Sequence, residues 1–452
     1  MSEKTRASFP GTFWAANTIE LFERAAYYSM ASFVVIYLKE ALGMTPTFAT
    51  FLNGTLLWGL VYFLPILSGS LADRYGYKRS LTVAFVMLSL GYFVMGNLQR
   101  FWPGLIGARS SQAIDYSVPV MMGILLIGIG GSIVKPCIAG TIQKTAGKWA
   151  TLGFGIFYMV INIGSISGRG VAYLVRRQFG IPSIFFPVAS AFALTGLLVT
   201  LLVYREPEYA ADGVKDSQIV KRKTLSEALL GIFLVLKSLK FVLFLVFIGL
   251  FWVLYLQLYN LFPLFLRFID PGAPVELYTL ANPIMIVTLQ LAVTRLVKKW
   301  SPVRSIIAGI IVTTCGMLLN LIPVLFLKDL AQRTSLLGVT LPIAGLVMIG
   351  SIAAMALGEM MASPRIYEYL GSIAPKGEEG LYLGYANLPV AIGSIIGGTL
   401  GGILFETFIN TPFKNGRPVN VLPIWPILAV IGLVSMTGLA IYNRVLLRAK
   451  GA

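Results

Sequence analysis

The sequence has no histidine and only two cysteines in 452 residues. The lack of imidazole excludes zinc or haem bound through histidine, and it leaves carboxylates to bind protons near neutral pH. Cys137 and Cys315 each lie within a long apolar run, so they predict neither a disulfide framework nor a metal site. The apolar runs also lack nucleophilic triads and metal-ligand spacings, so the sequence does not predict a membrane enzyme.

Charged residues are scarce too, at 12% of the chain, whereas 57% of the residues are hydrophobic and the mean hydropathy is +0.80. A soluble chain of this length could not bury so much apolar surface, so we expect a protein that crosses the membrane many times. The net charge of +17 lies mainly in short loops between apolar runs. This distribution indicates membrane topology rather than nucleic-acid binding, and it favours the inner (cell) membrane with both termini cytoplasmic.

Twelve apolar segments are long enough to cross about 30 Å of hydrocarbon as helices. They lie at 12–40, 49–72, 79–98, 117–142, 149–175, 181–204, 239–267, 277–298, 303–327, 337–372, 380–405 and 421–446. The longest hydrophilic run separates six from six, so we expect an all-α membrane protein, a monomer with a six-helix bundle at 1–204 and another at 239–452. Between them, 205–238 reads as a cytoplasmic linker that includes an interfacial helix at 224–238.

The first long apolar segment carries an unusual charged stripe. Glu20, Glu23, Arg24 and Tyr27 are spaced i, i+3, i+4 and i+7, so they share one face of a helix. Each ionisable side chain near a bilayer centre costs roughly 2.5–3.5 kcal/mol, so these groups must face a cavity or one another. The stripe therefore predicts a transport pathway.

A basic loop joins the second and third segments. It contains a glycine and aspartate frame together with several cations: Gly69, Asp73, Arg74, Gly76, Lys78 and Arg79. This loop resembles the signature of the major facilitator superfamily, which implies a gating loop between two helices that pack closely. A simple basic inside loop would explain the cations but not the frame. The run TRLVKKWSPVRS joins the eighth and ninth segments and weakly repeats the loop.

Several stretches together resemble the proton-dependent oligopeptide transporter family of that superfamily. They are ELFERAAYYSMASFVVIYL at 20–38, YFLPILSGSLADRYG at 62–76, GIGGSIVKPC at 128–137 and FYMVINIGSISG at 157–168, followed by FWVLYLQ, ANPIM, GEMMASP and IAPKGEEG. The resemblance implies the major facilitator fold, in which two bundles enclose one central site near the midplane, and it implies protons as the coupling ion with no other cofactor. By resemblance, proton coupling falls to Glu20, Glu23, Arg24 and Lys135.

The same resemblance implies where a solute would bind. Glu359 would meet an amine of the solute, and the other expected contacts are Tyr28, Tyr62, Lys135, Asn162, Gln257 and Asn282. Alternatives remain open for several of them. The asparagines could serve as contacts between helices, the tyrosines could pack against apolar neighbours, and Lys135 could extend toward the headgroups.

Two departures from the family pattern concern charge. Members carry an arginine three positions after the second tyrosine, where this chain has Ala31, and commonly a glutamate before the glutamine of the seventh span, where it has Leu256. Arg169 follows Asn162 by two helical turns and could either bind a solute anion or extend to the outer headgroups. For Arg365 we expect an ion pair, for which Glu368 offers a local partner.

These observations predict a secondary transporter, with proton-coupled symport of small peptides or peptide-like solutes by alternating access. One alternative is a different solute, such as an organic anion held by Lys135 and Arg169. Another is a membrane receptor of the same fold that transports nothing. The expected partners are a small solute and membrane lipids.

Overall fold

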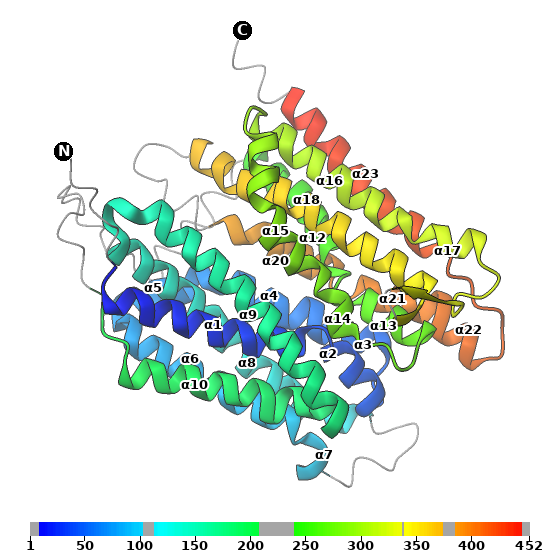
Figure 1. The fold of residues 1–452 in the computed structure, drawn as a ribbon, viewed down its shortest axis with the longest axis horizontal. Coiled ribbons are helices and arrows are strands. Elements are labelled where there is room, and N and C mark those ends of the chain that lie inside the picture. The colour runs from blue at the N-terminus through cyan, green and yellow to red at the C-terminus, as the bar shows by residue number, and fades with distance from the viewer. Residues whose placement is uncertain (1–8, 103–112, 208–238, 337–338, 374–384, 445–452) are drawn as a thin grey trace. The chain divides into compact units, whose positions relative to one another are not determined.

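The computed structural model describes residues 9–102, 113–207, 239–336, 339–373 and 385–444. These residues are helical throughout except for connecting loops and one β-hairpin (Figure 1). The predicted interfacial helix at 224–238 and the loop at 374–380 lie outside the described residues.

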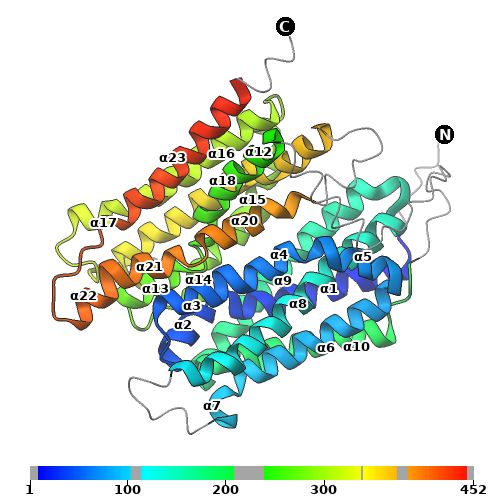
Figure 2. The same cartoon turned by 180° about the vertical axis from the view of Figure 1, so that it is seen from behind.

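The described residues form two compact units, seen from opposite sides in Figures 1 and 2. Unit 1 comprises the described parts of Met1–Met30, Leu64–Pro103 and Val118–Leu230, and unit 2 those of Ala31–Phe63, Gly104–Ser117 and Gly231–Ala452. The predicted division at 204 and 239 stays a prediction. The compact units differ from it chiefly in the stretch 31–63, which belongs to unit 2.

The described part of unit 1 consists of six longer helices and four short helical elements that connect them. They are α1 (Gly11–Ala31), α5 (Pro65–Tyr75), α6 (Tyr77–Gly96), α7 (Leu98–Phe101), α8 (Ala113–Ala146), η4 (Gly147–Trp149), α9 (Ala150–Phe179), η5 (Ile181–Ile184), η6 (Phe185–Ala189) and α10 (Ser190–Leu202). The last residue of α1, Ala31, and the first residues of α8, up to Ser117, fall in unit 2. Small residues permit close packing here, because a Cβ on Gly91 would lie 2.7 Å from the Ile127 side chain.

Unit 2 contains the remaining helices and the hairpin. Its first part has α2 (Val34–Ile36), η1 (Tyr37–Ala41), α3 (Pro46–Thr50), η2 (Phe51–Leu57) and α4 (Trp58–Phe63). Then follow α12 (Leu239–Leu256), α13 (Leu261–Ile269), α14 (Val275–Thr279), α15 (Ala281–Val297), α16 (Pro302–Leu319), α17 (Leu321–Phe326), β1 (Arg333–Leu336), β2 (Val339–Pro342) and α18 (Ile343–Ile373). The last are η7 (Tyr385–Asn387), α20 (Leu388–Gly397), α21 (Leu400–Phe405), η8 (Glu406–Asn410), α22 (Thr411–Lys414) and α23 (Ile424–Tyr442).

Nine described helices are long and apolar enough to cross a membrane, and a tenth span results if Pro46–Phe63 and Pro65–Tyr75 count as one broken helix. The charged helices α1, with 21 residues, and α9, with 30, are also long enough. Each of the twelve predicted segments thus corresponds to helix within the described residues. Large apolar side chains such as Val118, Leu174 and Leu291 are exposed on these helices, as a surface in contact with lipid requires.

Two predicted boundaries are wrong. The tenth segment was predicted from 337, but its first described residues form the strand β2, which pairs antiparallel with β1, and α18 starts only after Pro342. The β-branched residues Val339 and Thr340 suit that strand. The eleventh segment was expected to end at 405, but helix continues to Lys414. Within this extension Asn410 Nδ2 donates to both carboxylate oxygens of Glu406 at 3.0 Å.

The stretch 31–63 packs on unit 2 through small and polar residues. A Cβ on Gly54 would lie 2.6 Å from the Gly398 Cα, so η2 and α20 meet backbone to backbone. Asn53 Nδ2 donates to Asn260 Oδ1 at 3.0 Å, and the hydroxyls of Thr55 and Thr399 lie 2.9 Å apart. Polar side chains therefore pair across this contact and help to hold the stretch on unit 2.

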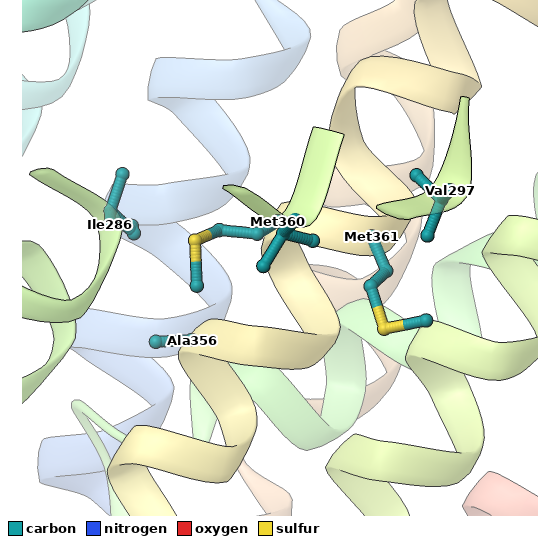
Figure 3. Packing of buried hydrophobic residues seen from close by; sticks show 6 residues of the cluster. Ile286, Val297, Ala356, Met360 and Met361 are labelled. Carbon is teal, nitrogen blue, oxygen red and sulfur yellow. The ribbon is translucent and has the colours of Figure 1, made fainter. Parts of the chain in front are cut away.

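Methionines fill the contact between α15 and α18. Figure 3 shows the Met360 side chain pointing toward Ile286 and the Met361 side chain lying near Val297, while Ala356 leaves room below Met360. Flexible thioethers suit such irregular gaps. This packing fixes the positions of the residues next to it on both helices, Asn282 and Glu359.

Candidate functional site

The charged stripe of α1 is buried in unit 1. Glu20, Glu23 and Arg24 are 0%, 1% and 7% exposed. Arg24 Nε lies 3.4 Å from Glu20 Oε1 and also forms an ion pair with Glu23, and the guanidinium stands 5.4 Å from the centre of the Tyr27 ring. Two carboxylates thus share one arginine. The pair of Arg24 with Glu20 follows the i, i+4 spacing, whereas Glu23 is the neighbour of Arg24 in sequence. A proton on either carboxylate would remove one of these ion pairs.

Lys135 on α8 lies beside this cluster. It is partly buried, and it is near enough to Glu20, Glu23 and Arg24 for their charges to act on it. The predicted neighbourhood of Lys135 and the stripe is therefore present. Its role in proton coupling stays a prediction.

A glycine seam brings α9 against α1. A Cβ on Gly164 would lie 2.7 Å from the Leu21 carbonyl oxygen, and one on Gly168 would overlap the Ala25 carbonyl and lie 2.9 Å from its Cα. The residue numbers increase in the same direction on both helices, from Gly164 at Leu21 to Gly168 at Ala25, so the helices run parallel at this contact. The seam explains how polar side chains of α9 reach α1.

Asn162 and Arg169 are both buried on α9, and Arg169 lies against Tyr28 of α1. Asn162 is 6% exposed and donates to the Tyr158 carbonyl of its own helix at 2.9 Å. Arg169 is 0% exposed, with its guanidinium 4.5 Å from the Tyr28 ring centre and hydrogen-bonded to the Ser165 hydroxyl and to its carbonyl at 3.3 Å. The guanidinium is therefore directed back along α9 and inward, which argues against extension toward the outer headgroups.

Unit 2 holds a second polar cluster. Asn282 Nδ2 of α15 donates to Glu359 Oε2 of α18 at 3.3 Å, and the Tyr255 hydroxyl of α12 donates to Asn282 Oδ1 at 3.4 Å. The structure thus brings Asn282 and Glu359 together and adds Tyr255. The sequence reasoning missed Tyr255 as a separate contact, although it lies in the stretch FWVLYLQ, because an aromatic residue in an apolar run is typical of packing.

Gln257 and Tyr62 lie elsewhere in unit 2. Gln257 is fully buried, and its Nε2 donates to the backbone oxygens of Val253 and Gly397, at 2.8 and 3.2 Å. It therefore links α12 to α20. The Tyr62 ring stacks on Trp58 with 5.3 Å between ring centres. Contact with a solute stays a prediction for both residues.

The basic loop of unit 1 is held from a distant part of the chain. The Glu206 carboxylate accepts hydrogen bonds from the backbone N–H groups of Tyr77 and Lys78, at 2.5 and 3.0 Å, and thereby caps the start of α6. Gly76 precedes them with φ of 90°, a conformation that favours glycine. Glu206 was missed, since its sequence neighbours read as linker and nothing local indicates a contact with residue 77.

The other loop residues surround this contact. Asp73 accepts a hydrogen bond from the Tyr77 hydroxyl at 2.7 Å, and Lys78 Nζ donates to the Leu201 carbonyl at 3.0 Å. Arg74 and Arg79 are exposed, and a Cβ on Gly69 would be in ordinary contact with Pro136. The loop borders a surface hollow of about 670 Å³. It is thus a hydrogen-bonded connection between α5, α6 and the end of α10.

The local partner expected for Arg365 is confirmed. Its Nη1 pairs with Glu368 Oε2 at 2.5 Å, and its Nη2 donates to the Val297 carbonyl at 2.6 Å. This arginine therefore joins α18 to the end of α15.

Comparison with known proteins gives the family. The family described as Major Facilitator Superfamily matches residues 20–356. The chain belongs to the major facilitator superfamily. It is accordingly a multi-pass membrane protein of a transporter superfamily and not an enzyme.

Curated relatives are dipeptide and tripeptide permeases. Permease B of Photorhabdus asymbiotica is 27% identical and permease B of Salmonella typhimurium 28% identical, each over 202 residues, 43% of this chain and 36% of the relative. Permease A of Citrobacter koseri is 28% identical over 43% of this chain and 35% of its own length. The match thus spans about a third of the length of these relatives.

Solved structures share the fold over nearly the whole chain. A chain from a study of substrate recognition in proton dependent oligopeptide transporters has a TM-score of 0.70, with 19% identity over 98% of this chain and 99% of that one. A peptide transporter POT in complex with sulfate also has a TM-score of 0.70, with 17% identity over 96% and 95%. The fold is therefore the major facilitator fold of these transporters, and the family resemblance noted in the sequence is confirmed as a distant one.

Proposed function

We propose that this protein is a proton-coupled symporter of small peptide-like solutes that works by alternating access. One observation carries the proposal: two buried glutamates, Glu20 and Glu23, both form ion pairs with Arg24 in a transmembrane helix. Protonation of either carboxylate leaves Arg24 with one charged partner instead of two. Because ions are costly in this environment, such a change shifts the balance between two helix arrangements.

Lys135 and Glu359 extend the machinery in this proposal. Lys135 interacts electrostatically with Glu20, Glu23 and Arg24, so binding of a proton to either glutamate changes the electrostatic energy of the lysine. In unit 2, Glu359 is held by Asn282 and meets an amine of the solute. The remaining proposed solute contacts are Tyr28, Tyr62, Asn162, Arg169, Gln257 and Asn282. The loop at 69–79 acts as a gate, the termini are cytoplasmic and the protein works as a monomer.

The names of the relatives support a peptide solute, since they are dipeptide and tripeptide permeases. A second candidate is an organic anion. Ala31 and Leu256 stand where the family carries charged residues, which disfavours an ordinary peptide, and Lys135 and Arg169 would hold the anion in this alternative. A receptor that does not transport would bind a ligand without flux.

The test uses purified protein in proteoliposomes with an inward proton gradient and labelled alanylalanine. We expect gradient-driven uptake that is lost in Glu20→Gln and Glu359→Gln. Asp329→Asn, a change at an exposed acid after α17, is the matched control and should transport normally. Uptake that ignores the gradient would overturn proton symport. Binding without uptake would favour the receptor.

A further inference from the structure

The surface hollow of unit 1 lies where three candidate spans end. The described residues that line it come from the end of α5, the start of α6, the end of α8 and the segment after α10. The candidate spans Tyr77–Gly96, Ser117–Ala146 and Ile181–Leu202 each begin or end within a few residues of this lining. Since such spans end at the edge of the hydrocarbon, the hollow lies at the level of the lipid headgroups.

Two arginines stand at the open edge of the hollow. Arg74 and Arg79 both line it and are both exposed, and the Arg74 guanidinium lies 5.5 Å from the centre of the Tyr75 ring. A guanidinium presents a planar fork of N–H donors, which matches the oxygens of a phosphate group. The edge thus offers two cations that a phosphate at headgroup level can reach.

The other charged residues described in the hollow make contacts within the protein. Asp73 accepts a hydrogen bond from the Tyr77 hydroxyl, and Glu206 accepts from the backbone N–H groups of Tyr77 and Lys78. Lys78 Nζ donates to a backbone carbonyl at the end of α10 at 3.0 Å, and Lys144 Nζ lies 4.2 Å from the centre of the Tyr77 ring. These contacts fix the loop backbone from which the two arginines project.

An apolar stripe continues from Arg79 along α6. Val83, Val86 and Leu90 are 53%, 41% and 50% exposed. They follow the arginine by four, seven and eleven residues, so the four side chains share one face of the helix. In a membrane this face contacts acyl chains, while the arginine extends outward to the headgroups. A cation above an apolar stripe matches an amphiphile with a phosphate head better than it matches a soluble anion.

We propose that the hollow and the α6 stripe form a binding site for an anionic membrane phospholipid. The lipid phosphate lies at Arg74 and Arg79, and an acyl chain lies along Val83, Val86 and Leu90. All of these residues belong to unit 1, so the site is complete within that unit. The inference does not depend on the proposed transport function.

The test measures lipid binding to the purified full-length protein in a neutral detergent by native mass spectrometry. The probes are phosphatidylglycerol and phosphatidylcholine with identical acyl chains, together with glycerol phosphate as a soluble headgroup. Each cation near an anionic lipid contributes about a 5-fold change in affinity, so two cations should make wild-type protein bind phosphatidylglycerol roughly 25-fold more tightly than phosphatidylcholine. Glycerol phosphate, which has no acyl chain, should bind much more weakly than phosphatidylglycerol.

Two variants and a matched control locate the site. Arg74→Gln and Arg79→Gln should each reduce the preference for phosphatidylglycerol about 5-fold. Arg304→Gln removes an exposed arginine from the first turn of α16 in unit 2, within the run that weakly repeats the basic loop. It changes the net charge by the same amount and should leave the preference unchanged.

Three results would overturn the inference. One is equal binding of the two lipids, a comparison that needs no variant. Another is binding of glycerol phosphate as tightly as phosphatidylglycerol, which would indicate a site for a free anion. The third is an equal loss of preference in Arg304→Gln and Arg79→Gln, which would indicate a general effect of net charge. Transport is tested separately by the uptake assay, so its failure and the failure of this inference are distinguishable.

Discussion

The glycine seam between α1 and α9 leads to a sharp stability prediction for Gly168→Ala. The added Cβ would overlap the Ala25 carbonyl and lie 2.9 Å from the Ala25 Cα, and backbone atoms cannot rotate away as a flexible side chain can. The helices must separate, and overpacking of this kind costs about 1–3 kcal/mol. Replacing glycine by alanine also stabilises the folded state by about 0.4–1 kcal/mol, because it lowers the conformational entropy of the unfolded chain. The net expectation is a loss of about 1–2 kcal/mol.

Gly170→Ala supplies the control on the same helix. A Cβ there meets no atom within 4 Å, so the substitution keeps the gain from helix propensity without the clash. We expect thermal unfolding of purified protein in detergent to start earlier in Gly168→Ala and to be unchanged or later in Gly170→Ala. Equal midpoints in the two variants would refute the close approach of α1 and α9. It would also remove the geometric basis for placing Arg169 against Tyr28.

Two ion-dependent contacts give further predictions. Arg267 Nη2 and Nε lie 2.6 and 3.1 Å from the two Glu40 oxygens within unit 2, and because the side chains are partly exposed we expect a coupling of about 0.5–1 kcal/mol. A double-mutant cycle with Glu40→Arg and Arg267→Glu can be measured by thermal unfolding. The double variant, in which the two charges are exchanged, should recover part of the stability lost in the single variants, and additive losses would contradict the contact. Glu206→Gln should weaken the cap of α6 by about 1 kcal/mol and speed hydrogen exchange at the Tyr77 and Lys78 amides. Unchanged exchange would show that the cap does not hold the loop.

Much of the fold could be predicted because the membrane restricts what a chain can do. Apolar length alone located the spans, since each backbone group in lipid must be satisfied by a helix. The start of α18 was predicted too early, because a short apolar run preceding a helix looks the same whether it extends the helix or pairs as a strand. Val339–Pro342 forms a strand because it pairs with Arg333–Leu336, and this pairing is visible only in the structure.

In the candidate site, contacts within one helix could be predicted from the sequence, whereas contacts between elements could not. Glu20 and Arg24 are spaced i, i+4 on a single helix, so their ion pair could be predicted from spacing. Glu206 and Tyr255 could not, because their partners lie on other elements and no local pattern encodes such contacts. Residues joined by helix periodicity are thus predictable, whereas those joined by tertiary packing require the structure.

The relation between Ala31 and Arg169 concerns stability. An arginine at 31 would follow Tyr28 by three positions and lie on the same face of α1, next to the ring that Arg169 covers. An arginine at 31 would place a second guanidinium beside this partly exposed ring and add a further ionisable group to the span, at a cost of roughly 2.5–3.5 kcal/mol on insertion scales. The small side chain at 31 therefore makes a buried arginine on α9 tolerable.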